Sequence, residues 1–235
     1  MIVSKSETLR QLRSEIRGIE RSSISDKPRS FISSGFKALD AILPGGGLPL
    51  GSLVELLGDE ASGALTFALQ LARKAIETKA AWAVVDTAGS FYPPAAAQRG
   101  LDIGKLIVIR IQPHNAAWAF GQLLRCPDVG ASFLCRAGVP AYPASPGKFA
   151  LRTASLDNMT YRRLQLAAER GGGLGFVLRP KEAIRRPCWA AVRLLVEGSG
   201  RRDWSVPSTR RALRVVLLHV RESNATGSVT LDIDE

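Results

Sequence analysis

Residues 45–66 read GGGLPLGSLVELLGDEASGALT, which is a glycine-rich start, a short apolar run and two glycines five positions apart. The part from Gly58 to Thr66 has the glycine spacing of the phosphate-binding loop G-x-x-x-x-G-K-[ST], whose backbone N–H groups curl around phosphate oxygens. That loop needs a lysine at position 64 and a hydroxyl at position 65, but this chain has Ala64 and Leu65. An ordinary strand–turn–helix corner also carries such glycines, so the surrounding sequence has to decide.

The sequence on both sides of this loop keeps a definite order. Upstream, residues 32–35 read ISSG and residues 39–40 read LD; downstream, residues 82–86 read WAVVD, an apolar run typical of a buried parallel strand. This order and spacing resemble the RecA recombinase family over about residues 31–132, and more loosely over about 174–235. The resemblance implies an α/β fold, a RecA-like three-layer sandwich with a mostly parallel central sheet, lacking the C-terminal domain of full-length recombinases.

The resemblance also assigns the positions at which the family carries charge for ATP hydrolysis. Two residues after Asp86 the family has a glutamate that polarises the attacking water, and this chain has Ala88. The run at 129–135 lacks the acidic residue that the family links to Mg²⁺ at the end of this strand. Because phosphoryl transfer depends on positioning and charge, we predict a pseudo-ATPase, not an enzyme. We expect no cofactor, neither ATP nor Mg²⁺, and no metal.

The vestige of the phosphate loop would then consist of Gly58, Gly63, Ala64, Leu65 and Thr66. The alternative is a divergent DNA-dependent ATPase that uses Thr66 and an acidic residue elsewhere in the chain. ATP turnover separates these two interpretations.

Three further runs carry a second, narrower resemblance. Residues 156–180 read LDNMTYRRLQLAAERGGGLGFVLRP, residues 187–196 read PCWAAVRLLV and residues 227–235 read GSVTLDIDE. They resemble ImuA, the RecA-like family of bacterial mutagenesis cassettes. The resemblance implies a DNA-damage-induced accessory protein of the SOS response that acts in translesion synthesis, in the cytoplasm at the nucleoid. It also implies the partners, which are an ImuB-like polymerase-family protein, a DnaE-type error-prone polymerase and RecA. A regulator that caps or disassembles RecA filaments is the alternative.

Length and composition bound the organisation of the chain. With 235 residues, of which 46% are hydrophobic, it can form one core with an N-terminal appendage. No apolar run has the length of a membrane span, and no signal peptide is recognisable. The three cysteines form neither a disulfide framework nor a zinc set, which favours a reducing cytoplasm.

The N-terminal segment, residues 1–30, is predicted to be an interaction helix followed by a linker, before a core at 31–235. The helix would span about residues 5–22 and carry an apolar stripe on a charged rod. The stripe consists of Leu9, Leu12, Ile16 and Ile19. It has to pack on the chain's own core, on another subunit through self-association, or on a different partner.

Two features of the second half shape the expected fold. Residues 136–155 contain three prolines and two glycines, too many for a core strand, so we expect an irregular loop there. A helix is predicted at about 158–170, with Asp157 as its N-cap, Gly171 at its end and Leu164, Ala167 and Ala168 facing inward. Apolar runs at 176–178, 194–196 and 213–220 predict strands that are covered on both faces. The resemblance to the RecA family implies closing strands at 189–196, 212–220 and 228–233.

The net charge of +11 is concentrated in the second half, with 13 basic and 4 acidic residues in 162–214. Arginine dominates, and arginine suits planar phosphate contacts, so single-stranded DNA is a predicted ligand. Trp204 lies in a loop where it could stack on a base. The candidate nucleic-acid contacts are Arg162, Arg163, Arg179, Arg185, Arg186, Arg201, Arg202 and Trp204. The alternative is a solvated basic surface that only keeps the protein soluble.

Overall fold

The computed structural model describes residues 30–59, 62–135, 156–186, 188–198, 210–221 and 223–234. The predicted N-terminal helix with its apolar stripe and the predicted loop at 136–155 lie outside these ranges. From Phe31 onward the described residues form one compact unit.

A central eight-stranded sheet has the strand order β10-β9-β8-β3-β7-β6-β4-β5. The strands are β3 (Ser52–Leu57), β4 (Ala81–Asp86), β5 (Leu106–Arg110), β6 (Val129–Cys135), β7 (Leu174–Arg179), β8 (Val192–Gly198), β9 (Arg210–Val220) and β10 (Gly227–Asp234). The six strands from β8 to β5 are parallel, while β9 pairs antiparallel with both β8 and β10. The predicted mostly parallel sheet is therefore confirmed. A separate two-stranded sheet joins β1 (Phe31–Ile32) to β2 (Leu48–Pro49).

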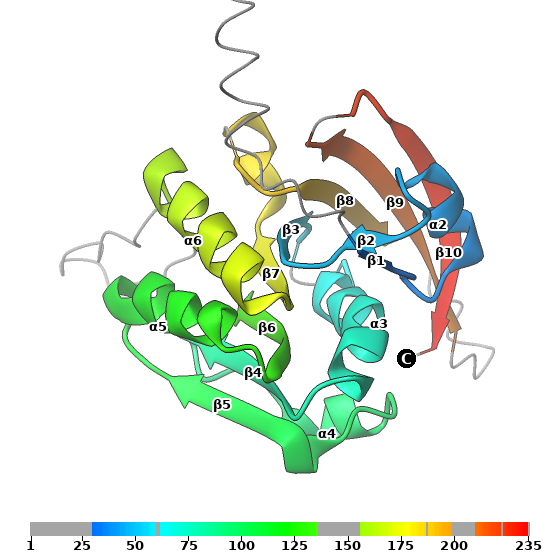
Figure 1. Cartoon of the computed structure of the whole chain (residues 1–235). Coiled ribbons are helices and arrows are strands. Elements are labelled where there is room, and N and C mark those ends of the chain that lie inside the picture. Colours follow the sequence, from blue (N-terminus) through cyan, green and yellow to red (C-terminus); the bar gives the residue numbers. More distant parts are fainter. Residues whose placement is uncertain are drawn as a thin grey trace, which may run out of the picture. The chain divides into compact units, whose positions relative to one another are not determined.

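Helices cover both faces of this sheet, as Figure 1 shows. The helices are α2 (Lys37–Ile42), α3 (Ala64–Glu77), α4 (Pro93–Ala97), α5 (Pro113–Arg125) and α6 (Asn158–Gly171), with short 3₁₀ turns η1 (Ile103–Lys105) and η2 (Lys181–Arg185). The elements α2, α3 and α4 share one hydrophobic core with the sheet, and α5 and α6 share the other. This arrangement confirms the predicted three-layer sandwich.

The strands in the middle of the sheet are apolar on successive residues because helices cover them on both sides. All side chains of β3, β6 and β7 are buried. The aromatic rings of Phe133 on β6 and Phe176 on β7 stack with centroids 5.0 Å apart, which fixes the two neighbouring strands to each other. β8 begins at Val192, so Trp189 precedes the strand instead of starting it, and its ring is 39% exposed.

Helix α6 follows its sequence prediction closely. The Asp157 carboxylate accepts a hydrogen bond from the Thr160 N–H over 2.7 Å, which makes it the N-cap, and Leu164, Ala167 and Ala168 are buried. The end of the helix differs by one residue. Gly171 is still helical, and Gly172 is the residue in the left-handed conformation, with φ of 75°. A glycine accepts this conformation without the steric cost that a Cβ would bring.

Candidate functional site

The predicted phosphate-loop corner connects the end of β3 to the start of α3, at the edge of the sheet where the parallel strands end. Gly63 occupies the N-cap of α3 with φ of 82°, a left-handed conformation that favours glycine. Ala64 is the first residue of the helix and is buried, while Leu65 and Thr66 follow it, each half-buried. A strand–turn–helix corner is thus present where the sequence predicts the vestige of a phosphate loop.

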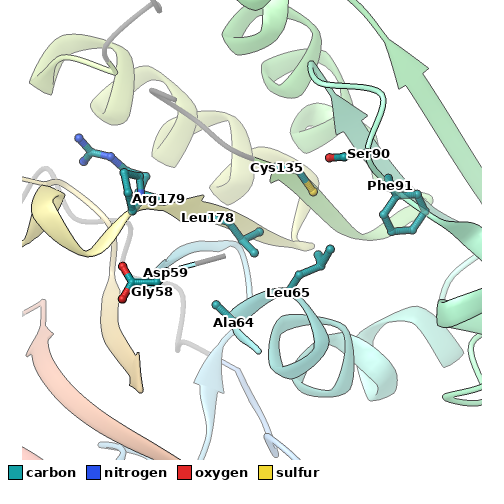
Figure 2. A pocket seen from close by; sticks show the side chains of 10 residues that line it. Gly58, Asp59, Ala64, Leu65, Ser90, Phe91, Cys135, Leu178 and Arg179 are labelled. Carbon is teal, nitrogen blue, oxygen red and sulfur yellow. The ribbon is translucent and has the colours of Figure 1, made fainter. Parts of the chain in front are cut away.

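A cavity of about 450 Å³ opens beside this corner. Its lining residues come from the corner, from the loop after β4, and from the ends of β6 and β7 (Figure 2); they are Gly58, Asp59, Ala64, Leu65, Ser90, Phe91, Cys135, Leu178, Arg179 and Pro180. Leu65, Leu178 and Cys135 converge on the cavity from three elements, while the Arg179 guanidinium lies on the side away from Phe91. In parallel α/β sheets, ligands bind outside the carboxyl ends of the strands, so this is the expected place for a site.

Hydrogen bonds within the corner occupy some of its backbone groups. The Ser62 N–H donates to the Asp59 carbonyl over 2.9 Å, and the Ala64 N–H donates to the Ser62 hydroxyl oxygen over 3.3 Å. The Gly58 N–H donates to the Arg179 carbonyl over 3.1 Å. The first amide of α3, which in a phosphate loop would point at an anion, therefore has a partner inside the chain.

Asp86 holds the loop after β4 in place. Its carboxylate is buried and accepts hydrogen bonds from the N–H groups of Ala88, Ser90 and Phe91, at 3.2, 3.2 and 3.0 Å. This turn places the Phe91 ring in the cavity wall, edge-on to Trp82 with centroids 6.3 Å apart. Ala88, which stands where the resemblance expects a catalytic glutamate, is not among the lining residues.

Cys135 ends β6 and pairs in register with Asp86 on β4. It occupies the strand end at which the resemblance expects an acidic residue. Burial, together with the neighbouring Asp86 charge, raises the pKa of Cys135 to about 12. The thiol is therefore neutral at physiological pH and presents a small apolar surface to the cavity.

Glu55 forms a buried ionic cluster beneath the sheet surface. Its Oε1 accepts hydrogen bonds from the Tyr161 hydroxyl over 2.7 Å and from the Arg179 Nη1 over 2.9 Å, and its Oε2 accepts from the Arg193 Nε. Arg193 also donates to the Ala183 carbonyl over 2.6 Å. Burial and the Glu55 charge raise the pKa of Tyr161 well above its ordinary value.

This cluster corrects one predicted DNA contact. Arg179 is only 6% exposed and is committed to Glu55, so it is a structural residue and not a surface contact for phosphate. Sequence reasoning missed the cluster, although a signal was present: Glu55 is the single charged residue in the apolar strand SLVELL, and a charge buried in this way needs a partner.

The other predicted DNA contacts divide into two groups. Arg162, Arg163, Arg185 and Arg186 are exposed, and Arg201, Arg202 and Trp204 lie outside the described residues. The fold brings α6 next to the segment that follows η2. The Arg162 guanidinium on α6 lies 5.7 Å from the centroid of the Trp189 ring in that segment. The Arg221 guanidinium lies 5.5 Å from the same ring and 3.9 Å from the Glu169 carboxylate. A basic surface with one aromatic ring thus exists on this part of the molecule.

The described part of the chain contains neither a metal-binding cluster nor a membrane-spanning helix. No group of three or more His, Cys, Asp or Glu side chains is arranged to hold a metal ion. No helix there combines the length and the apolar character needed to cross a membrane.

Comparison with known proteins agrees with the geometry of the corner and the sheet. Residues 19–124 match the family model of the RecA N-terminal domain. The match covers less than half of the chain and shows a likeness to that domain over those residues. The RecA-like chain is also similar to a crystal structure of the RadB recombinase, with a TM-score of 0.59 and 20% identity, over 84% of this chain and 94% of that one. At this identity the likeness concerns the fold.

RecA proteins are among the curated relatives that match part of the chain. Protein RecA of Chlorobium chlorochromatii is 40% identical over 88 residues, which are 37% of this chain and 24% of that protein. Protein RecA of Streptomyces venezuelae is 38% identical over 95 residues, 40% of this chain and 25% of that protein. The RecA-like chain therefore spans about a quarter of the length of these relatives.

Proposed function

We propose that this protein is a non-catalytic RecA-like accessory factor. The observation that carries the proposal is the composition of the cavity at the phosphate-loop corner. Ala64 and Leu65 occupy the two positions that would supply the phosphate-binding cation and the metal-binding hydroxyl, and Cys135 ends the strand that would supply an acidic residue. A magnesium–triphosphate group does not fit these residues, because they offer it apolar side chains in place of charge.

Electrostatics support this reading of the cavity. Among the described lining residues the single cation is Arg179, whose guanidinium pairs with the buried Glu55 carboxylate. The other charged lining residue is Asp59, which is exposed and would repel a phosphate. Catalysis of phosphoryl transfer is almost entirely positioning and charge stabilisation, and little of either is available here.

The proposed role is in SOS mutagenesis, as an ImuA-type protein that links an ImuB-like protein, a DnaE-type polymerase or RecA to DNA. The support is the resemblance of residues 156–180, 187–196 and 227–235 to that family, together with the exposed arginines on α6 and at the end of η2. Co-purification with an ImuB-like protein and with RecA tests the partners directly. Inhibition of RecA strand exchange without any effect on polymerase recruitment would favour the filament regulator instead.

An ATPase assay tests the non-catalytic proposal. We expect phosphate release at the level of a protein-free blank, with and without single-stranded DNA, while a RecA protein assayed in parallel turns over. Ala64→Lys should also stay at the blank level, because groups that act as one catalytic unit are strongly non-additive. DNA-stimulated turnover that Thr66→Ala removes would establish the divergent ATPase and overturn the proposal.

A further inference from the structure

The cavity at the phosphate-loop corner has the properties of a ligand site for a different kind of molecule. Its volume of about 450 Å³ falls within the range of small-molecule sites, which are mostly apolar with a few polar groups. Ala64, Phe91, Cys135 and Leu178 are each less than a tenth exposed and form the wall together with the half-buried Leu65. A ligand that fills the cavity would therefore contact carbon and sulfur atoms.

The wall is held by the fold before any ligand arrives. Cys135 and Leu178 belong to paired central strands, and Ala64 and Leu65 belong to the first turn of α3. Phe91 is fixed by the hydrogen bond that its backbone N–H donates to the Asp86 carboxylate and by the edge-on contact of its ring with Trp82. Binding to a preformed wall of this kind avoids the cost of ordering side chains.

The polar groups around the cavity disfavour anions. Asp59 places a carboxylate in the lining, Ser90 contributes a neutral hydroxyl, and the Arg179 guanidinium is committed to Glu55. The Ala64 amide already donates to Ser62. Removing an anion from water without a compensating partner is costly, whereas an uncharged ring gains from leaving water.

We propose that this cavity binds an uncharged aromatic group of one or two rings. The inference concerns the chemistry of the cavity and does not depend on the proposed role in mutagenesis. The ring can be part of a small molecule or a side chain presented by a protein, because both offer the same surface to Phe91, Leu65 and Leu178.

The test uses the full-length protein and four probes, each observed by saturation-transfer NMR. Indole represents a free ring and the blocked tripeptide acetyl-Gly-Trp-Gly-amide represents a presented side chain, while indole-3-acetate is the matched anion and ATP is the family's nucleotide. We expect indole to bind with a Kd of about 1 mM or lower, and indole-3-acetate to bind at least about tenfold more weakly. Tighter binding of the tripeptide than of indole would identify a protein side chain as the source, and the reverse would identify a small molecule.

Two variants locate the binding. Ala64→Phe places a ring in the cavity. Because this new side chain occupies the space that indole would fill, indole binding should fall at least about tenfold. Ala38→Phe adds the same ring at an exposed position of α2 and should leave binding unchanged. Leu65→Asp is a second cavity variant, compatible with the first turn of a helix, and should also abolish binding. Circular dichroism confirms that each variant is folded.

Three results would overturn the inference. They are the absence of indole and tripeptide binding up to about 10 mM, binding that Ala64→Phe and Leu65→Asp leave intact, and equal binding of indole and indole-3-acetate. ATP turnover is not part of the readout. Failure here would leave the non-catalytic proposal standing, and ATP hydrolysis with intact indole binding would remove only that proposal.

Discussion

At the scale of the residue, Glu55 shows how a charge can be retained inside an apolar sheet. Its carboxylate is fully buried and is shared by Arg179, Arg193 and Tyr161. Removing one partner of a buried ion pair leaves an uncompensated charge, so Glu55→Ala should lower the free energy of unfolding by about 3–5 kcal/mol. Tyr161→Phe leaves both ion pairs and should cost about 1.5 kcal/mol. Urea unfolding measures both values.

A surface carboxylate provides the control for this cluster. Glu197 pairs with Lys181 at 2.8 Å and with Arg214 at 3.6 Å, but all three side chains are at least 30% exposed. Solvent screening weakens such pairs, so Glu197→Ala should change stability far less than Glu55→Ala. Equal effects of the two substitutions would contradict the burial of the Glu55 cluster.

Cys135 leads to a prediction about pH. Burial and the nearby Asp86 charge raise the pKa of its thiol to about 12, from an ordinary value of 9.0. Because the thiolate is the reacting species, alkylation by iodoacetamide should rise about tenfold per pH unit between about pH 7 and pH 10 without reaching a plateau. In denaturant the rate should level off above pH 9. The measurement uses a variant with Cys126→Ser and Cys188→Ser, so that Cys135 reacts alone.

The same shift has a defined sign for stability. Above pH 9 the unfolded chain loses the Cys135 proton while the folded chain keeps it until about pH 12. The unfolded state then binds fewer protons, so the contribution of this thiol makes the free energy of unfolding fall as the pH rises through that window. A folded-state alkylation rate that levels off near pH 9 would contradict the raised pKa.

At the scale of the element, the N-terminal segment is predicted to bind a partner. Its apolar stripe at Leu9, Leu12, Ile16 and Ile19 is a sequence prediction outside the described residues. Deletion of residues 1–22 should leave the thermal unfolding of the core nearly unchanged, because the described part from Phe31 onward forms its own compact unit. The same deletion should weaken co-purification with an ImuB-like protein or RecA, or self-association.

Thermal unfolding of the truncated protein shows where the apolar stripe packs. A truncated protein that melts well below the full-length chain would place the apolar stripe in the chain's own core. The double variant Leu12→Ser with Ile16→Ser, in the full-length chain, separates loss of the stripe from loss of the whole segment. It should reproduce the binding defect while the unfolding temperature stays the same.

At the scale of the whole molecule, the basic surface predicts salt-dependent binding of single-stranded DNA. If about four to six arginines meet phosphates, the log–log slope of affinity against salt should be about −3 to −4, from ~0.7 ions released per contact. Replacing the exposed Arg185 and Arg186 by alanine should flatten the slope by about 1.4 units if both meet phosphates, without loss of fold. Fluorescence anisotropy at several salt concentrations measures the slope.

The matched control replaces two exposed lysines on other helices by alanine, Lys37 on α2 and Lys74 on α3. It lowers the net charge by the same amount and should leave the slope unchanged. An equal effect of both double variants would indicate attraction by total charge alone. Absence of binding at low salt would show that the basic surface serves solvation or protein contacts.

The sequence by itself determined the architecture around the phosphate-loop corner. The glycine spacing from Gly58 to Gly63 and the mostly apolar, fully buried strands β3, β6 and β7 depend on local rules. A residue in left-handed conformation favours glycine, and a strand buried on both faces has to be apolar on successive residues. The N-cap at Asp157 could be predicted for the same reason, since the capping bond reaches only three residues along the chain.

The tertiary structure alone decided which charged side chains are buried and what the cavity offers a ligand. Arg179 looked like one more member of a basic run, yet it pairs with Glu55, 124 positions away, and Tyr161 reaches the same carboxylate across 106 positions. Phe91, Cys135 and Leu178 likewise meet at one cavity from separate strands and loops. Sequence spacing carries no record of such partners, because the free energy of a buried charge or ring depends on the atoms around it after the chain has folded.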